Sequence, residues 1–302
     1  MRASRLIDAS TYVLSGKRGK RNMAEFTTSD GTQIFYKDWG AGQPIVFSHG
    51  WPLSADDWDA QMLFFLNHGY RVIAHDRRGH GRSAQVSEGN DFDHYADDLA
   101  DLTAHLDLHD AVHVGHSAGG GEVARYIGRH GESRVAKAVL ISAVTPSVLQ
   151  TEANPAGVPK AAFEGLQAQT VANRSEFYRA VPSGPFYNYD QPGVEPSEAV
   201  IANWWRQGMM GGAKGQYDTV TGFIREDWTE DLKKITVPVL AMHGEADQIV
   251  PIATSAPRAV QLVQNGTLIF LRSSVQSSRM NPRRCRTGPS RRPSCPGATS
   301  SR

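Results

Sequence analysis

The sequence predicts an α/β fold, built as a mostly parallel, doubly wound sheet with a helical cap insertion. Short apolar runs typical of buried strands alternate four times with amphipathic helical patterns, which favours parallel pairing through right-handed crossovers. The alternation stops between about residues 145 and 230, where aromatic residues, Met, Gly and Pro are frequent, and then resumes. A Gly-x-Ser-x-Gly pattern at Gly115–Gly119 also lies between a strand pattern and a helix pattern.

The length of 302 residues allows one large α/β domain, which we expect to span residues 23–271. The insertion at about residues 145–230 is expected to cover the sheet edge and line an apolar pocket. Residues 1–22 hold six Lys/Arg and one acid, and predict a disordered basic extension. Residues 272–302 hold eight Arg, no acid and no apolar periodicity, and predict a disordered tail rich in Arg, Ser and Pro.

Charge and composition argue against two classes of partner. The net charge is +1, but residues 23–271 carry 18 bases and 30 acids, so the folded body is acidic and no nucleic-acid partner is expected. Apolar runs of 18 residues and a signal-peptide pattern are both missing, so we expect no membrane partner and a cytoplasmic location. The two cysteines, Cys285 and Cys295, lie in the tail, which fits a reducing compartment. A homo-oligomer is left open.

Local patterns place the individual elements. The expected strands are residues 33–37, 44–48, 71–75, 112–116, 135–142, 237–243 and 267–271. The expected helices are residues 57–66, 92–106, a segment beginning near Gly119, and residues 256–263. Asp91 is the candidate N-cap of the second helix, and the acids Asp93, Asp97, Asp98 and Asp101 are interpreted as its solvated face.

Ser117 is the candidate catalytic nucleophile. A sharp strand-to-helix turn holds such a residue in a strained backbone conformation and exposes its side chain. Gly115 and Gly119 leave room for the neighbouring strand and helix, and the helix directs its positive end at the serine. The pattern alone is also compatible with an ordinary strand-to-helix turn, so the rest of the chain has to decide.

A serine nucleophile needs a base, a carboxylate that orients the base, and donors for the oxyanion. Asp247 is the candidate carboxylate because it follows a late apolar strand; Glu245 lies closer to the strand end and is the weaker candidate. The alternative for Asp247 is an acid that only braces its loop. The oxyanion donors are expected to be the backbone N–H groups of Ala118, after the nucleophile, and Trp51, after an early strand.

Five stretches together resemble the cofactor-free haloperoxidase and aryl-esterase family of α/β-hydrolases. They are His49-Gly-Trp-Pro-Leu-Ser-Ala-Asp-Asp-Trp58, His75-Asp-Arg-Arg-Gly-His-Gly-Arg-Ser83, Gly115-His-Ser-Ala-Gly-Gly-Gly-Glu-Val-Ala-Arg125, Val181-Pro-Ser-Gly-Pro-Phe186 and Trp205-Arg-Gln-Gly-Met-Met210. The resemblance runs from about Met23 to Leu268. It implies an α/β-hydrolase fold and a serine hydrolase that acts on carboxylic esters without cofactor or metal.

The same resemblance implies a perhydrolase side activity, in which a short carboxylic acid and hydrogen peroxide give a peracid that oxidises halide. Ser117 at the nucleophile position argues against the dehalogenase and epoxide-hydrolase branches, which place Asp there.

The chain departs from the family at its C-terminal end. The family's catalytic His follows the last strand and would fall at or near Gln276, but no His occurs after His243. The last strand and helix are therefore expected to be incomplete. His49, His75, His80 and His116 lie near the expected site, but their family positions serve loop shape.

A frameshift is our hypothesis for the tail. Asn281–Cys285 can be encoded so that the next reading frame gives a family-like Thr-His-Ala-Asp-Val. Met280 followed by Asn281 places a stop codon in that frame, so a single slip does not explain the whole tail. Resequencing the gene tests the hypothesis.

Three functions remain after this comparison. The first is an esterase with perhydrolase activity, impaired by the absent His. The second is a catalytically inactive homologue or small-molecule-binding protein. The third, nucleic-acid binding through the basic ends, is disfavoured by the acidic body.

Overall fold

The computed structural model describes residues 24–271, and these contain an eight-stranded sheet in the order β1-β2-β4-β3-β5-β6-β7-β8. The strands are β1 Glu25–Thr27, β2 Gln33–Trp39, β3 Pro44–Ser48, β4 Arg71–His75, β5 Ala111–His116, β6 Val135–Ile141, β7 Val239–Gly244 and β8 Gly266–Leu271. Strands β1 and β2 run antiparallel to their neighbours, and the remaining pairs are parallel. The predicted α/β class with a mostly parallel sheet is confirmed.

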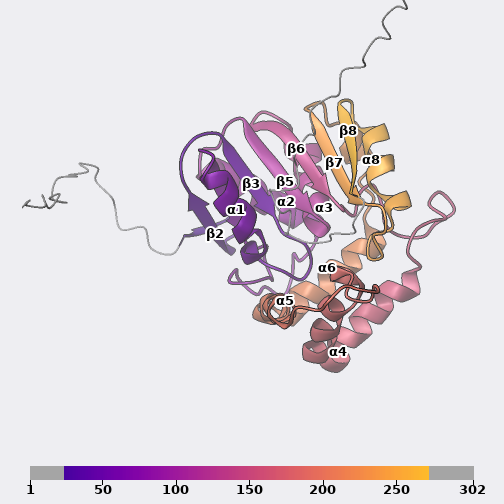
Figure 1. Ribbon diagram of the computed structural model, residues 1–302. Coiled ribbons are helices and arrows are strands. Elements are labelled where there is room, and N and C mark those ends of the chain that lie inside the picture. The colour runs from indigo at the N-terminus through magenta and orange to yellow at the C-terminus, as the bar shows by residue number, and fades with distance from the viewer. Residues whose placement is uncertain (1–23, 272–302) are drawn as a thin grey trace, which may run out of the picture.

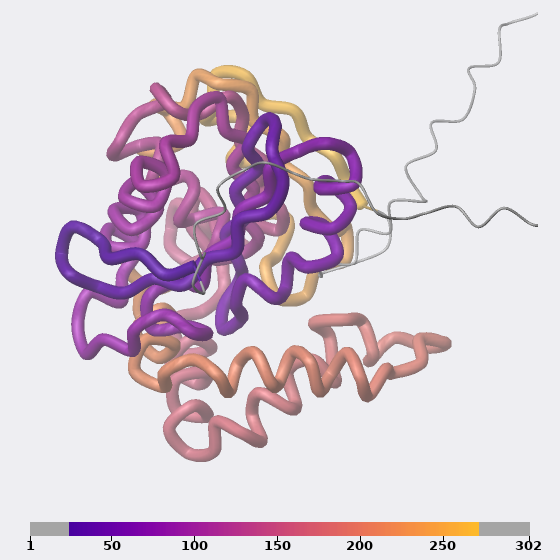
Figure 2. Tube along the Cα trace, turned by 90° about the vertical axis from the view of Figure 1, so that its left-hand side faces the viewer, coloured from indigo at the N-terminus to yellow at the C-terminus, as the bar shows by residue number. Residues whose placement is uncertain are grey.

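Eight α-helices accompany the sheet in this part of the chain. They are α1 Asp59–Leu66, α2 Phe92–His105, α3 Ala118–His130, α4 Lys160–Ser183, α5 Glu198–Met210, α6 Ala213–Arg225, α7 Thr229–Lys233 and α8 Ala256–Leu262. Helices α4–α7 all lie between β6 and β7 in the chain. Figures 1 and 2 show α4, α5 and α6 as a separate cap at one end of the sheet. Among the described residues, no helix is long and apolar enough to cross a membrane.

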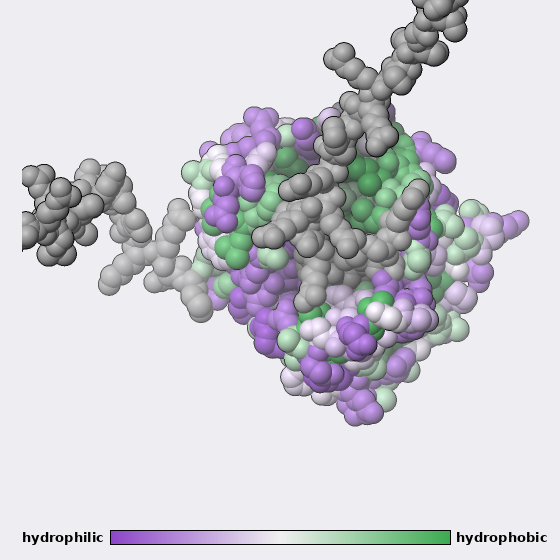
Figure 3. Space-filling model, in the orientation of Figure 1, coloured by the Kyte–Doolittle hydropathy of each residue, from purple (hydrophilic) through white to green (hydrophobic). Residues whose placement is uncertain are grey.

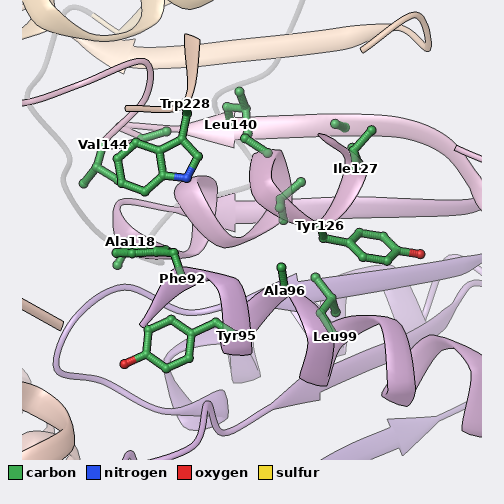
Figure 4. Packing of buried hydrophobic residues seen from close by; sticks show 14 of the residues in the cluster. Phe92, Tyr95, Ala96, Leu99, Ala118, Tyr126, Ile127, Leu140, Val144 and Trp228 are labelled. Atoms are coloured by element: carbon green, nitrogen blue, oxygen red, sulfur yellow. The ribbon is translucent and has the colours of Figure 1, made fainter. Parts of the chain in front are cut away.

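The two faces of the sheet pack against different helices because side chains alternate along each strand. Ile45 and Phe47 join the cluster that includes Trp58 and Met62 of the α1 region. Val46, between them, joins the larger cluster formed with α2 and α3. In Figure 4, Phe92, Tyr95 and Leu99 of α2 face Ala118 and Ile127 of α3, and Trp228 lies at one end of the same cluster.

The face that carries α1 is covered unevenly. Beyond α1, the apolar residues Val139 and Ile141 of β6 are only partly buried. In β8, the consecutive residues Ile269 and Phe270, whose side chains lie on opposite faces of the sheet, are 41% and 49% exposed. The edge of the sheet at β8 is thus less well packed than its centre.

Helix α2 begins as predicted, since the Asp91 side chain accepts from the His94 backbone N–H at 3.0 Å. The interpretation of Asp98 as part of a solvated face is wrong. Asp98 is 3% exposed and forms a two-pronged ion pair with Arg78, at 2.6 Å from Nε and 2.5 Å from Nη2. Burial, opposed by Arg78, raises the pKa of Asp98 to about 6. Arg78 lies in the loop after β4, so the local helical pattern could not reveal this partner.

The expected basic extension and Arg-rich tail, including Gln276, lie outside the described residues.

Candidate active site

Ser117 lies between β5 and α3 with a backbone φ of 52° and ψ of −117°. A non-glycine residue at positive φ is strained by about 1–3 kcal/mol and persists only where its surroundings hold it. Those surroundings are close-packed. A Cβ on Gly119 would lie 2.1 Å from the Ser48 carbonyl oxygen, and one on Gly115 would lie 2.3 Å from the Gly119 carbonyl oxygen. The half-buried Ser117 side chain is therefore displayed by a turn that tolerates only glycine at both flanks.

The proposed oxyanion donors lie on two sides of this turn. Ala118 is the first residue of α3, so its backbone N–H has no partner inside the helix. Trp51 lies in the turn after β3, which the Leu53 N–H closes by donating to the Gly50 carbonyl at 2.9 Å. The backbone of Gly50 comes close to the nucleophile, since a Cβ there would lie 3.4 Å from Ser117 Cβ. The elements after β3 and β5 thus meet at Ser117.

Asp247 lies in the loop after β7 and is 8% exposed. Its Oδ1 accepts from the backbone N–H groups of Ile249 and Val250, both at 2.9 Å. Its Oδ2 lies 3.4 Å from His243 Nε2. Burial acts to raise the pKa of Asp247, but His243 and the two N–H groups lower it below its usual value, so the carboxylate is held ionised.

Known proteins of similar sequence and fold supply an independent comparison. The family model described as the alpha/beta hydrolase fold matches residues 43–272. A non-heme haloperoxidase from Rhodococcus erythropolis is 62% identical over 242 residues, covering 80% of this chain and 88% of that protein. The chain belongs to the α/β-hydrolase family.

Other proteins similar to this α/β-hydrolase are named either as esterases or as haloperoxidases. A bifunctional esterase/perhydrolase from Acinetobacter calcoaceticus is 60% identical over 249 residues, covering 82% of this chain and 90% of that protein. Among solved structures, a bromoperoxidase from Bacillus anthracis has a TM-score of 0.77 at 34% identity, covering 82% of this chain and 91% of that one. An esterase from Exiguobacterium antarcticum has a TM-score of 0.80 at 29% identity, covering 86% and 94%. The resemblance inferred from the sequence motifs is confirmed.

In this α/β-hydrolase, sequence reasoning did not identify Glu122 as a structural centre of the site. Glu122 is fully buried on α3, one turn beyond Ser117. Its Oε1 accepts from Ser48 Oγ at 3.1 Å and lies 2.7 Å from His75 Nε2, and its Oε2 accepts from Arg77 Nε at 2.8 Å and Nη2 at 2.5 Å. Burial acts to raise the pKa of Glu122, but Arg77 and His75 hold it at about 2. The one sequence feature that could have indicated this role is an acidic residue in the first turns of a helix whose other residues there are small or apolar.

The Glu122–Arg77 pair also reaches the turn that carries Trp51. Arg77 Nη2 donates to the His49 carbonyl at 2.8 Å, and the Arg77 backbone N–H donates to His49 Nε2 at 3.0 Å. Because Nε2 accepts, the proton of the His49 ring is on Nδ1, which lies 2.9 Å from the Gly50 carbonyl oxygen. The His49 ring is thereby committed to loop structure.

The other histidines near the site, His75, His80 and His116, are also buried. His75 is engaged by Glu122, and His80 Nδ1 lies 3.1 Å from the Arg78 carbonyl oxygen. Burial is the main cause that lowers the pKa of His80 to about 3 and that of His116 to about 4. Neither ring nitrogen of the buried His116 has a hydrogen-bond partner within residues 24–271. In these residues, no histidine is hydrogen-bonded to the Ser117 hydroxyl.

His243 was not singled out by sequence reasoning as part of the site. It is fully buried, and its Nε2 lies 2.9 Å from the Val250 carbonyl oxygen as well as 3.4 Å from Asp247. The ring spans the loop that carries the carboxylate, and so supports that loop.

The cap brings an aromatic cluster against the Trp51 turn. Leu53 of that turn packs with four buried cap residues: Phe177, Tyr178, Phe186 and Trp204. The structure shows hollows of about 470 Å³ beside Trp205 on the cap and about 420 Å³ beside Arg78, and Ser117 lines neither of them. No group of three residues suited to binding a metal occurs in the described part of the chain.

Proposed function

We propose that this α/β-hydrolase is a serine hydrolase acting on carboxylic esters, with perhydrolase and haloperoxidase side activity. The observation that carries the proposal is the backbone of Ser117, which is held at positive φ. This residue lies at the start of α3, where the ends of β3 and β5 meet. Its relatives named haloperoxidase and esterase/perhydrolase support the choice of substrate, a small ester or a short carboxylic acid with hydrogen peroxide.

In the proposed mechanism, Ser117 Oγ attacks the ester carbonyl carbon and loses its proton. The carbonyl oxygen becomes an oxyanion that the backbone N–H groups of Trp51 and Ala118 stabilise. Collapse of the intermediate breaks the ester C–O bond and releases the alcohol with the transferred proton, leaving an acyl-serine. Water then gives the carboxylic acid, or hydrogen peroxide gives the peracid, and either step restores the Ser117 hydroxyl.

Halide oxidation follows from the peracid. Transfer of its terminal oxygen to chloride, with uptake of one proton, yields hypochlorous acid and the carboxylic acid. The halide loses two electrons and the peroxy bond accepts them, so the step balances without a metal or haem.

Proton removal from Ser117 is the weak step in this chain. Asp247 is the proposed carboxylate of the triad, but the imidazole between it and Ser117 is not supplied by residues 24–271. We expect the residual catalysis that an oxyanion site and substrate binding provide when a triad is incomplete.

Two measurements separate an impaired enzyme from an inactive, ligand-binding homologue. Covalent labelling by a fluorophosphonate, located by mass spectrometry, should occur at Ser117 and be lost in Ser117→Ala. Turnover of p-nitrophenyl acetate above that of Ser117→Ala supports the esterase proposal. A chain that shows neither labelling nor turnover would support the inactive homologue, a candidate favoured by the missing imidazole.

The domain limits and the cytoplasmic location remain predictions.

A further inference from the structure

Gln216 is a fully buried residue of the cap helix α6, and it contacts the turn after β3 that carries Trp51. Trp51 donates its indole Nε1–H to the backbone carbonyl of Gln216 at 2.8 Å. The Gln216 side chain donates from Nε2 to the Pro52 carbonyl at 3.2 Å. One residue of the cap therefore binds two consecutive residues of the turn.

The same side chain is tied to the other cap helices. Its Nε2 also donates to the Gly208 carbonyl of α5 at 2.7 Å. Its Oε1 accepts from Tyr178 Oη at 2.9 Å and from Arg174 Nη1 at 3.2 Å, both on α4. A primary amide has two N–H donors and two acceptor lone pairs, so these contacts use its full hydrogen-bonding capacity.

These contacts allow only one orientation of the Gln216 side-chain amide. A rotated amide would place Nε2 against the donors of Tyr178 and Arg174, and Oε1 against the carbonyls of Pro52 and Gly208. Because Gln216 has no exposure to solvent, water cannot replace a lost contact there. The side chain therefore fixes the distance between the cap and the turn.

The position of this turn matters for the proposed chemistry. Trp51 also packs on the cap through its ring, which meets that of Tyr178 edge to face at 5.6 Å. On the opposite side, the turn is held by Arg77 through the His49 carbonyl. A donor N–H stabilises an oxyanion only when held close to its required place, and displacement by about 1 Å can lower the rate about 100-fold.

We propose that Gln216 is a positioning residue that sets the place of the Trp51 backbone N–H relative to Ser117, so that the cap and the oxyanion donor move as one unit. The role of Trp51 in this statement rests on the proposed function. The coupling itself is a property of the hydrogen bonds and can be measured without catalysis.

Two substitutions in the full chain separate this role from simple support of the cap. Gln216→Met removes all polar contacts of the side chain while keeping its length. Gln216→Glu retains the acceptors for Tyr178 and Arg174 and removes the donors to Pro52 and Gly208. The matched control is Gln167→Met, because half-buried Gln167 donates to the Tyr217 carbonyl and to Thr221 within the cap and does not touch the turn.

Hydrogen exchange followed by mass spectrometry gives the first readout. Both Gln216 variants should speed exchange in a peptide covering residues 50–54 by about tenfold, as the loss of one or two net hydrogen bonds predicts. Exchange in α2 should not change. The Gln167→Met variant should leave residues 50–54 within about twofold of the parent chain.

Steady-state hydrolysis of p-nitrophenyl acetate gives the second readout. We expect kcat to fall about tenfold in Gln216→Glu with KM within about twofold, because the donor acts mainly in the transition state. Unchanged exchange at residues 50–54 in both Gln216 variants, or an equal increase in the Gln167 control, would overturn the proposal. If the parent chain neither turns over nor labels, the proposed function fails, while the exchange result still decides the coupling.

Discussion

The two halves of the candidate site differ in how firmly the fold holds them. The nucleophile and oxyanion half is enclosed by β3, β5, α3 and the cap, with Glu122 beneath it and Gln216 above it. The acid half lies after β7, beside β8, where Ile269 and Phe270 are 41% and 49% exposed. Figure 3 shows apolar surface on this side of the molecule.

This difference separates two requirements of acyl transfer. Orientation of the proposed nucleophile and oxyanion donors depends on the first half, whose residues all lie within the described part of the chain. Proton transfer would depend on the second half, where Asp247 is the proposed carboxylate and no imidazole of residues 24–271 joins it to Ser117. Preorganisation and proton transfer can therefore be disturbed separately in this chain.

The strongest disturbance of the well-held half should come from Glu122→Gln. Removing one charge of a buried ion pair leaves Arg77 uncompensated, which costs about 3–5 kcal/mol of unfolding free energy. Urea denaturation followed by circular dichroism measures the loss. Glu226→Gln is the control, because Glu226 forms a partly exposed ion pair with Arg125 at 2.6 Å, and we expect it to lose less than about 1 kcal/mol.

The Glu122 carboxylate also makes the free energy of unfolding depend on pH. The pKa of Glu122 is lowered in the fold from 4.5 to about 2, so its stabilisation is present above pH 4.5 and is lost as the pH falls towards 2. In Glu122→Gln this part of the pH dependence should disappear. An identical acid profile in both chains would contradict the assignment.

Gly119→Ala should disturb the nucleophile turn by crowding. The new methyl group would lie 2.1 Å from the Ser48 carbonyl oxygen, so the turn must shift at a cost of about 1–3 kcal/mol. Thermal unfolding and fluorophosphonate labelling should both decline. Gly165→Ala is a matched control in α4, since its new Cβ would have no neighbour within 4 Å beyond the adjacent backbone of its own helix, and it should be neutral or stabilising.

Imidazole in solution should partly replace the base that the second half lacks. General-base catalysis contributes about 10²–10⁴-fold in enzymes, and we expect a free imidazole to recover about tenfold in hydrolysis of p-nitrophenyl acetate. Ser117→Ala in the same imidazole buffer corrects for catalysis by imidazole itself. Equal rates in the two chains would show that the base is not what limits Ser117.

Asp247→Asn should have the smallest effect. In a complete triad the carboxylate orients the imidazole, and its amide substitution lowers kcat by about 10⁴-fold. Without that imidazole we expect Ser117 labelling to change by less than about threefold, because an Asn side-chain oxygen can still accept from Ile249 and Val250. A loss of 100-fold or more in labelling would mean that Asp247 is coupled to a base after all.

Much of the fold could be predicted from local patterns. Strands β3 and β4 match their apolar runs residue for residue, and Ser117 was recognisable from its flanking glycines and the change from strand to helix. The burial of Asp98 was missed because its partner, Arg78, comes from another loop.

The site's supporting contacts were harder to predict for the same reason. Glu122 acts through Arg77, which is 45 positions away in the chain, and Gln216 contacts Trp51, which is 165 positions away. A glutamate or glutamine in a helix is ordinarily solvent-exposed, and nothing in its local sequence indicates which distant carbonyl or guanidinium it will meet. Contacts of this kind become visible only when the cap and sheet are placed together.

The backbone conformation of Ser117 also has an evolutionary consequence. A serine at positive φ lowers the stability of the chain by about 1–3 kcal/mol, and glycine at that position would relieve the strain. A lineage with no use for the hydroxyl would therefore gain stability by a single substitution. The strained serine at this position therefore agrees with the proposed use of its hydroxyl.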